Sequence, residues 1–152
     1  MNERIQAAIE YYCKYQERSH HEVVGKLREL GCWGEEADEL LAYVIEKGLL
    51  NEERYAKALA RGKFRMKSWG RIKIVQALKL NRVSEYCIKA ALKEIDEDEY
   101  ETTLNRLLEK KMEELRAERN SLQKKGKLYR YLVQKGYEQQ MVSAAINKLF
   151  TK

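Results

Sequence analysis

The segment "RVSEYCIKAAL" (Arg82 to Leu92) decides the fold, because a similar segment, "GYEQQMVSAAI", recurs at Gly136 to Ile146. When the two are superposed, apolar residues coincide at offsets 1, 5, 6, 9 and 10 from the first residue. That spacing is typical of one face of a helix that begins after a short turn. A third copy, "GCWGEEADELLA" (Gly31 to Ala42), fits if one residue is inserted, which places Trp33 opposite Tyr137.

The copies begin at residues 31, 82 and 136, so the repeat period is about fifty residues. A period of this length suits a three-helix unit that buries part of its apolar face against the next unit. We therefore predict an all-α protein in which three tandem three-helix repeats form an elongated, curved helical array of the right-handed type. The predicted boundaries are 1–48 for the first repeat, 49–95 for a basic middle repeat and 96–152 for the third.

The composition supports helix along nearly the whole chain, which has no proline and is rich in Ala, Leu, Lys, Glu and Arg. Helix starts are predicted where side chains can cap the first turn, at Ser19, Asn51 and Ser84. Helix ends are predicted near Gly31, Gly48 and Gly136. The resulting nine helices lie near 3–16, 20–30, 34–47, 51–67, 70–80, 84–94, 97–119, 122–135 and 138–150.

Charge is unevenly distributed along the chain. The stretch from Arg54 to Arg82 holds ten Lys or Arg residues and no acid, although the net charge of the whole chain is only +6. On the first predicted helix, Tyr55, Leu59, Gly62 and Met66 would face the core. On the second, Ile72, Val75 and Leu78 or their close neighbours would be buried.

Exposed helices usually interleave both signs of charge, since like charges four residues apart are mildly destabilising. The basic faces are either a solvated surface or, as we prefer, an interface for an acidic partner, which could be a phosphate backbone or an acidic protein groove. The proposed interface residues are Arg54, Lys57, Arg61, Lys63, Arg65, Lys67, Arg71 and Lys73.

Two acidic runs, Glu35 to Glu39 and Glu94 to Glu101, flank the basic repeat. They could complement helix dipoles at helix starts, or repel nucleic acid and confine its contacts to the middle repeat. Trp69, between the two basic helices, is a candidate recognition aromatic and equally a packed hinge residue.

Signatures of catalysis are missing from the sequence, and we expect no enzymatic activity, no catalytic residue, no metal and no cofactor. His20 and His21 are adjacent, so on a helix they diverge and cannot together hold a metal. Cys13, Cys32 and Cys87 are widely separated and are expected to be buried, reduced thiols. The sequence shows neither an apolar membrane span nor the apolar core of a signal peptide, so a cytoplasmic protein without membrane contact is expected.

The segment "GLLNEERYAKALARGKFRMKSWGRIKIVQALKLNRVS" (Gly48 to Ser84) resembles the RecX family of bacterial recombination regulators. The resemblance lies in Gly48 to Glu52, in Arg54, Tyr55 and Ala56, and in Gly70 to Ile72, and it extends to a "KGY" helix at Lys135 to Tyr137. Arg82 stands where the family usually has Gly, so that turn is expected to close by another conformation.

This resemblance implies a monomeric regulator without enzymatic activity that binds the RecA filament on single-stranded DNA. It also implies inhibition of ATP hydrolysis, strand exchange and RecA-stimulated repressor cleavage, with consequences for DNA repair and the SOS response. The alternative is a nucleic-acid-binding helical protein that acts independently of RecA, using its basic patch or a helix-turn-helix. Against a helix-turn-helix, the candidate recognition helix carries Glu35, Glu36, Asp38 and Glu39, whose charge would repel phosphates.

Overall fold

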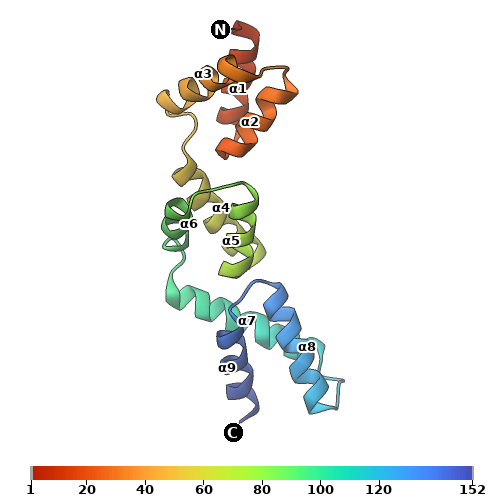
Figure 1. Cartoon of the computed structure of the whole chain (residues 1–152). Helices are drawn as coiled ribbons and strands as arrows, with labels where there is room; N and C mark the ends of the chain where they lie inside the picture. Colours follow the sequence, from red (N-terminus) through yellow and green to blue (C-terminus); the bar gives the residue numbers. More distant parts are fainter. Residues whose placement is uncertain (1, 152) are drawn as a thin grey trace. The chain divides into compact units, whose positions relative to one another are not determined.

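The computed structural model describes residues 2–151, and within this range the chain forms nine α-helices and no strand (Figure 1). The helices are α1 (Glu3–Tyr15), α2 (His20–Glu29), α3 (Gly34–Glu46), α4 (Glu52–Lys67), α5 (Arg71–Leu80), α6 (Glu85–Leu92), α7 (Glu97–Glu114), α8 (Ser121–Gln134) and α9 (Gln139–Phe150). The predicted all-α class and the number of helices are confirmed for the described residues.

One predicted helix is too long. The helix expected over 97–119 ends at Glu114, and turns lead from Leu115 to Asn120, the N-cap of α8. The buried residues of α7 end at Leu108, so the polar segment beyond it has little apolar surface to pack. Without tertiary packing, helical propensity alone does not maintain a further turn.

The predicted caps are present. The Ser19 hydroxyl accepts a hydrogen bond from the Glu22 amide at 3.0 Å, and the Glu22 carboxylate accepts one from the Ser19 amide at 2.8 Å. This is a complete capping box, in which two otherwise unpaired amides are satisfied. His20 and His21 therefore lie in the first turn of α2, as predicted.

The three repeats share one helix-ending turn. Gly31, Arg82 and Gly136 have φ angles of 80°, 56° and 103°, all in the left-handed region. The residue after each of them donates its amide to a leucine carbonyl five positions back, at 2.8, 3.1 and 3.2 Å. This bond closes a Schellman-type turn, and the leucines concerned (Leu27, Leu78 and Leu132) are fully buried.

Two expectations about these turns are wrong. Arg82 does not use another conformation: it adopts the left-handed one itself, at a cost of about 1–2 kcal/mol relative to glycine. The inserted residue that aligned Trp33 with Tyr137 is also unnecessary. Cys32 is the buried counterpart of Val83 and Tyr137, whereas Trp33 is 63% exposed.

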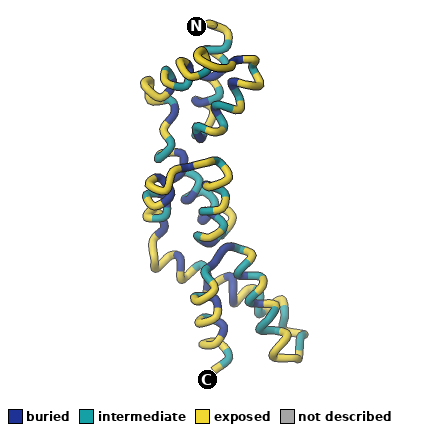
Figure 2. The backbone as a smooth tube through the Cα atoms, in the orientation of Figure 1, coloured by how far each residue is buried: buried dark blue, intermediate teal, exposed yellow. Residues whose placement is uncertain are grey.

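The chain packs as two compact units. Unit 1 comprises Met1–Leu59 and Ala77–Leu92, and unit 2 comprises Ala60–Gln76 and Lys93–Lys152, so α4 and α5 contribute residues to both. Along the helices, buried positions alternate with exposed ones (Figure 2). The predicted repeat boundaries at 48 and 95 remain a prediction, which we take up below.

Each unit has its own apolar core. The core of unit 1 is centred on Ile9, Val23, Leu27, Leu40 and Val44, and includes the buried free thiols of Cys13 and Cys32. Cys87, in the same unit, is likewise a buried free thiol. In unit 2, α7, α8 and α9 pack together around residues that include Tyr100, Leu104, Leu128, Leu132 and Tyr137.

The helical register predicted for α4 is partly wrong, and in α5 a close neighbour of the predicted Ile72 is buried in its place. Tyr55 and Leu78 are buried as expected, but Met66 is 84% exposed and Ile72 is 42% exposed. The buried positions of α4 also include Ala56, Ala60 and Phe64, at a strict spacing of four, and α5 buries Ile74 together with Leu78. Small alanines allow close helix approach, which a search for large apolar residues overlooked.

The start of α5 is joined to the turn between α8 and α9. The Gly70 amide donates to the Lys135 carbonyl at 2.8 Å, and the Ile72 amide donates to the Gly136 carbonyl at 2.9 Å. A Cβ atom on Gly70 would lie 2.3 Å from the Gly136 carbonyl group, and one on Gly136 would lie 2.4 Å from the Cβ of Lys73. Both glycines are therefore required for this approach.

An equivalent contact occurs in unit 1. Ser19 lies one repeat period before Gly70. Its hydroxyl group donates a hydrogen bond to the side-chain oxygen of Asn81 at 3.3 Å. Ser19 is fully buried, and Asn81 immediately precedes the left-handed residue of the second repeat. The start of the second helix in each of the first two repeats thus contacts the helix-ending turn of the following repeat.

We predict that Gly70→Ala destabilises the protein by more than about 2 kcal/mol, because the methyl group would meet backbone atoms that cannot rotate away. Gly62→Ala is the matched control, since a Cβ there has no atom within 4 Å and alanine favours helix by up to about 1 kcal/mol. Urea unfolding followed by circular dichroism measures both changes. Equal stability of the two variants would contradict the close-approach argument.

Candidate functional site

The eight predicted interface residues do not form one uniform surface. Two of them, Arg54 and Lys57, belong to unit 1, and the other six belong to unit 2. Arg54 pairs with the Glu17 carboxylate at 2.6 Å and donates to the Gly48 carbonyl at 3.0 Å, while Lys57 pairs with Glu53 at 3.1 Å. These two cations therefore have partners within their own unit.

In unit 2, Arg61 and Arg71 also have internal partners. The Arg61 guanidinium pairs with Glu94 at 2.7 Å, and that of Arg71 pairs with Glu97 at 2.6 Å and Glu138 at 2.8 Å. Part of the acidic run from Glu94 to Glu101 thus neutralises part of the basic stretch. Asp96 in the same run caps α7 by accepting the Glu99 amide at 3.0 Å, which is the helix-start role considered for these acids.

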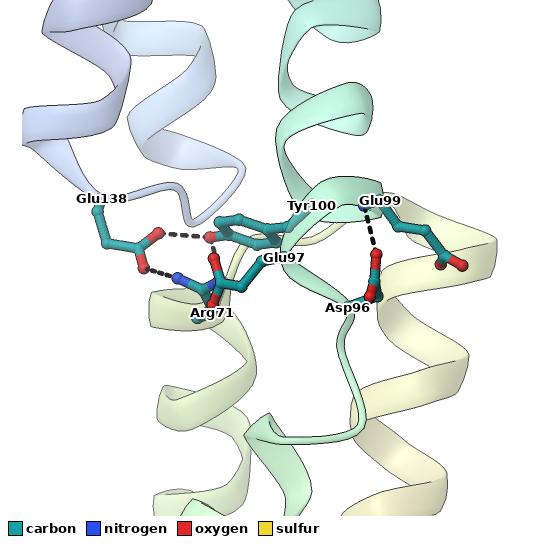
Figure 3. A network of polar contacts seen from close by, with 6 residues as sticks. All are labelled: Arg71, Asp96, Glu97, Glu99, Tyr100 and Glu138. Atoms are coloured by element: carbon teal, nitrogen blue, oxygen red, sulfur yellow. Dashed lines mark hydrogen bonds and ion pairs between the residues drawn. The ribbon is translucent and has the colours of Figure 1, made fainter.

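Arg71 and Tyr100 form the centre of a polar network that connects α5, α7 and the start of α9 (Figure 3). The Tyr100 hydroxyl donates to Glu138 and accepts the Arg71 amide at 2.9 Å. The guanidinium of Arg71 lies 3.9 Å from the centre of the Tyr100 ring, within range of a cation–π interaction.

Electrostatics fix the protonation states in this network. Burial raises the pKa of Tyr100, and its hydrogen bond to Glu138 raises it further, so the phenol remains a donor. Burial acts to lower the pKa of Arg71, but its hydrogen bonds to Glu97 and Glu138 outweigh this effect and raise it. Tyr100 therefore stays protonated and Arg71 stays charged across the physiological pH range.

The remaining four predicted cations, Lys63, Arg65, Lys67 and Lys73, make no ion pair with a carboxylate among residues 2–151. Lys63 and Lys73 share an aromatic neighbour instead. Their ammonium groups lie 4.9 Å and 4.7 Å from the centre of the half-buried Trp69 ring. The Trp69 ring, in the α4–α5 turn, thus lies close to one ammonium group from each of the two flanking helices.

Three further cations at this turn were missed by sequence reasoning. Arg106 of α7 donates to the Ser68 hydroxyl at 2.9 Å, and Lys135 donates to the Lys67 carbonyl at 3.0 Å. Lys110 is close enough to affect Lys135 electrostatically. The spacing of Arg106 and Lys110, four residues apart on one helix, is a signal that could have been read, but only the fold brings them to this turn.

We call this set the turn cluster. It comprises Lys63 and Lys73 beside Trp69, together with Lys67, Arg106, Lys110 and Lys135. Burial lowers the pKa of Lys135, and the positive charges of Lys73, Lys110, Lys67 and Arg106 lower it further. Arg106 of the cluster and the neighbouring Arg65 line a shallow pocket. Asp98 and Glu99 line the same pocket, so the cluster is bounded by acidic residues on this side.

The cluster can attract anions, but it is not built like a discrete phosphate cradle. The backbone amides at the start of α5 are already bonded to Lys135, Tyr100 and Gly136, so they cannot bind a ligand. Within residues 2–151, no group of three or more His, Cys, Asp or Glu side chains is placed to hold a metal ion. In the same range, no helix is long and apolar enough to cross a membrane.

The fold and this site define an all-α protein of tandem three-helix repeats with a cationic surface cluster. The chain matches the family descriptions "RecX, second three-helix domain" over residues 51–92 and "RecX, third three-helix domain" over residues 97–146. It is 31% identical over 134 residues to "Regulatory protein RecX" of Pelodictyon phaeoclathratiforme, covering 87% of this chain and 81% of that protein. The chain therefore belongs to the RecX family of regulatory proteins.

Two further comparisons point to the same family. "Regulatory protein RecX" of Clostridium perfringens strain 13 is 32% identical over 133 residues, or 87% of this chain, and the chain spans only 62% of the length of that relative. The fold is similar to that in "Crystal structure of RecX from Lactobacillus salivarius", with a TM-score of 0.86, 23% identity, and coverage of 96% of this chain and 94% of that one. The relatives from Pelodictyon phaeoclathratiforme and Clostridium perfringens are both named as regulatory proteins.

We predict that Tyr100→Phe lowers the free energy of unfolding by about 1–3 kcal/mol, because it leaves the Arg71 amide and the Glu138 carboxylate without the hydroxyl. Tyr86→Phe is the control, since Tyr86 is 73% exposed and should change stability by less than about 0.5 kcal/mol. Thermal unfolding by calorimetry reports both. A Tyr100→Phe protein as stable as the control would show that the hydroxyl is dispensable.

Proposed function

We propose that this chain is a monomeric regulator that binds the RecA filament on single-stranded DNA and inhibits its ATP hydrolysis, strand exchange and stimulated repressor cleavage. Family membership supports a regulatory role, and the resemblance of Gly48 to Ser84 to the recombination regulators implies RecA as the partner. We further propose that the protein acts in the cytoplasm, without catalytic chemistry of its own.

The turn cluster is the observation that carries the proposal. Its six cations make no ion pair with a described carboxylate, although the same unit holds enough acids to pair with Arg61 and Arg71. Mutual repulsion in such a cluster is unfavourable in the free protein. A negatively charged partner would relieve this repulsion on binding.

Only some of the eight predicted interface residues are free of ion pairs within their units. We propose that Lys63, Lys67 and Lys73, with Arg65 beside them, make intermolecular contacts, whereas Arg54, Arg61 and Arg71 mainly stabilise their units. The repeat boundaries 1–48, 49–95 and 96–152 are proposed as the divisions of the binding surface. Several repeats could contact successive RecA protomers, which would raise the effective concentration of each contact.

The alternative is a protein that binds nucleic acid independently of RecA. A helix-turn-helix mode is disfavoured, because Glu35, Glu36, Asp38 and Glu39 are exposed on α3, the candidate recognition helix. Direct binding through the basic residues needs no such helix. The two functions differ in their dependence on the RecA filament.

The test is single-stranded-DNA-dependent ATP hydrolysis by RecA, measured while this protein is titrated in. DNA is kept in excess so that sequestration of the strand cannot imitate inhibition. We expect inhibition at well below one molecule per RecA, because a filament modulator acts on many protomers at once. Absence of inhibition, together with tight binding to bare DNA, would contradict the proposal and favour the alternative.

A further inference from the structure

We propose that a second copy of this chain docks onto the start of α8 through the helix-ending turn of its first repeat, Gly31 to Trp33. The contact would repeat, between two molecules, the one that joins successive repeats within a molecule. This inference goes beyond the proposed function, and it does not require RecA.

The start of α8 differs from the starts of the two equivalent helices. Ser19 and Gly70, which precede α2 and α5, are buried and contact the turn of the following repeat. Asn120 precedes α8 at the same repeat period, but within the described chain it makes only local hydrogen bonds. Asn120, Ser121 and Leu122 are all exposed. The third repeat thus has a docking surface of the same kind with nothing on it in residues 2–151.

The backbone groups that would form this contact are unused. Where α5 meets the third repeat, the Ile72 amide donates to the Gly136 carbonyl at 2.9 Å. The equivalent amide of α8 is that of Leu122, and the equivalent carbonyl of the first repeat is that of Gly31. Neither group makes a hydrogen bond among the described residues. Docking would pair the Leu122 amide of one copy with the Gly31 carbonyl of another.

Exposed apolar side chains lie beside both of these groups. The side chain of Leu122 is 80% exposed, and that of Trp33 is 63% exposed. Trp33 follows the left-handed residue by two positions, as Glu138 does in the third repeat, and Glu138 lies against Arg71 in the first turn of α5. The same geometry would bring Trp33 of the docked copy to the first turn of α8, where it would cover Leu122.

Charge favours the same pairing. α8 contains four cations and no acid, and the exposed Arg119 just before it makes no ion pair within residues 2–151. α3, which begins at the turn of the first repeat, contains five acids and no cation. Within the chain, the corresponding contact already includes the ion pair between Arg71 and Glu138. Docking a second copy would therefore bring opposite charges together.

The contact is heterologous, because the two surfaces differ and each copy carries both of them. It is also small, and small interfaces are weak and transient, so the free chain stays monomeric in dilute solution. If the proposed function holds, copies bound next to one another on the filament would meet at a high effective concentration, which would make their binding cooperative.

The test is sedimentation velocity of the full chain from about 1 μM to about 500 μM, without RecA. The sedimentation coefficient should rise with protein concentration at about 0.05 M salt and rise less at about 0.5 M salt, since salt screens opposite charges. This comparison needs no variant. Leu122→Glu and Trp33→Glu should each weaken the association about tenfold or more, because each would bury a charge in the contact.

Tyr86→Glu is the matched control. Tyr86 is 73% exposed and is the second residue of α6, as Leu122 is the second residue of α8, so both substitutions place the same charge in a first turn. The control should associate like the parent protein. All three side chains are largely exposed, so the variants should also melt like the parent, which calorimetry checks.

A mixture of the two interface variants gives the sharpest result. Leu122→Glu retains the turn surface and Trp33→Glu retains the α8 surface, so together they should form a one-to-one dimer although neither associates alone. The inference is overturned if the parent chain stays monomeric at every concentration, if the control loses association equally, or if the mixture stays monomeric. RecA inhibition is measured separately on dilute protein, so either proposal can fail while the other stands.

Discussion

The approach of the 135–136 turn to the start of α5 is the constraint on which unit 2 depends. Amides that an isolated helix would leave to water are here bonded to two backbone carbonyls and one phenol. The contact is possible only because Gly70 and Gly136 have no Cβ atoms. It also sets the positions of the neighbouring residues, with Trp69 and Arg71 on either side of Gly70 and Lys135 immediately before Gly136.

This constraint explains why the polar residues around it have different roles. Arg71 follows Gly70 and is directed towards Glu97 and Glu138, where it is neutralised. Lys135 precedes Gly136 and is directed towards Lys67, where it meets other cations. The same backbone contact thus produces a satisfied ion-pair network and an unsatisfied cationic cluster within one unit. The stability of the first can offset the electrostatic repulsion of the second.

Much of the fold could be predicted because its signals are local. Capping residues such as Ser19 and turn glycines such as Gly31 determine where helices begin and end, and their effects extend over only a few residues. Arg82 shows the limit of this reasoning, since a non-glycine residue can be held in the left-handed conformation by the turn around it. Met66 was misassigned because buried alanines, not large apolar residues, define the packed face of α4.

The site was less predictable, because its composition depends on contacts between distant segments. Charge counting identified Lys63, Lys67 and Lys73, but it could not separate them from Arg61 and Arg71, whose partners lie 26 or more residues away in the chain. Lys135 could not be assigned at all, since only the contact with α5 brings it near Lys67. Ion pairs with distant residues therefore distinguish the cations that stabilise the fold from those that remain available to a binding partner.

The most direct test of this account is amide hydrogen exchange by nuclear magnetic resonance at Gly70 and Ile72. The amide of Leu108, inside α7, and that of the exposed Leu122, in the first turn of α8, serve as slow and fast references. If the start of α5 is bonded to the 135–136 turn, Gly70 and Ile72 should exchange nearly as slowly as Leu108. Exchange as fast as that of Leu122 would show that this contact does not organise unit 2.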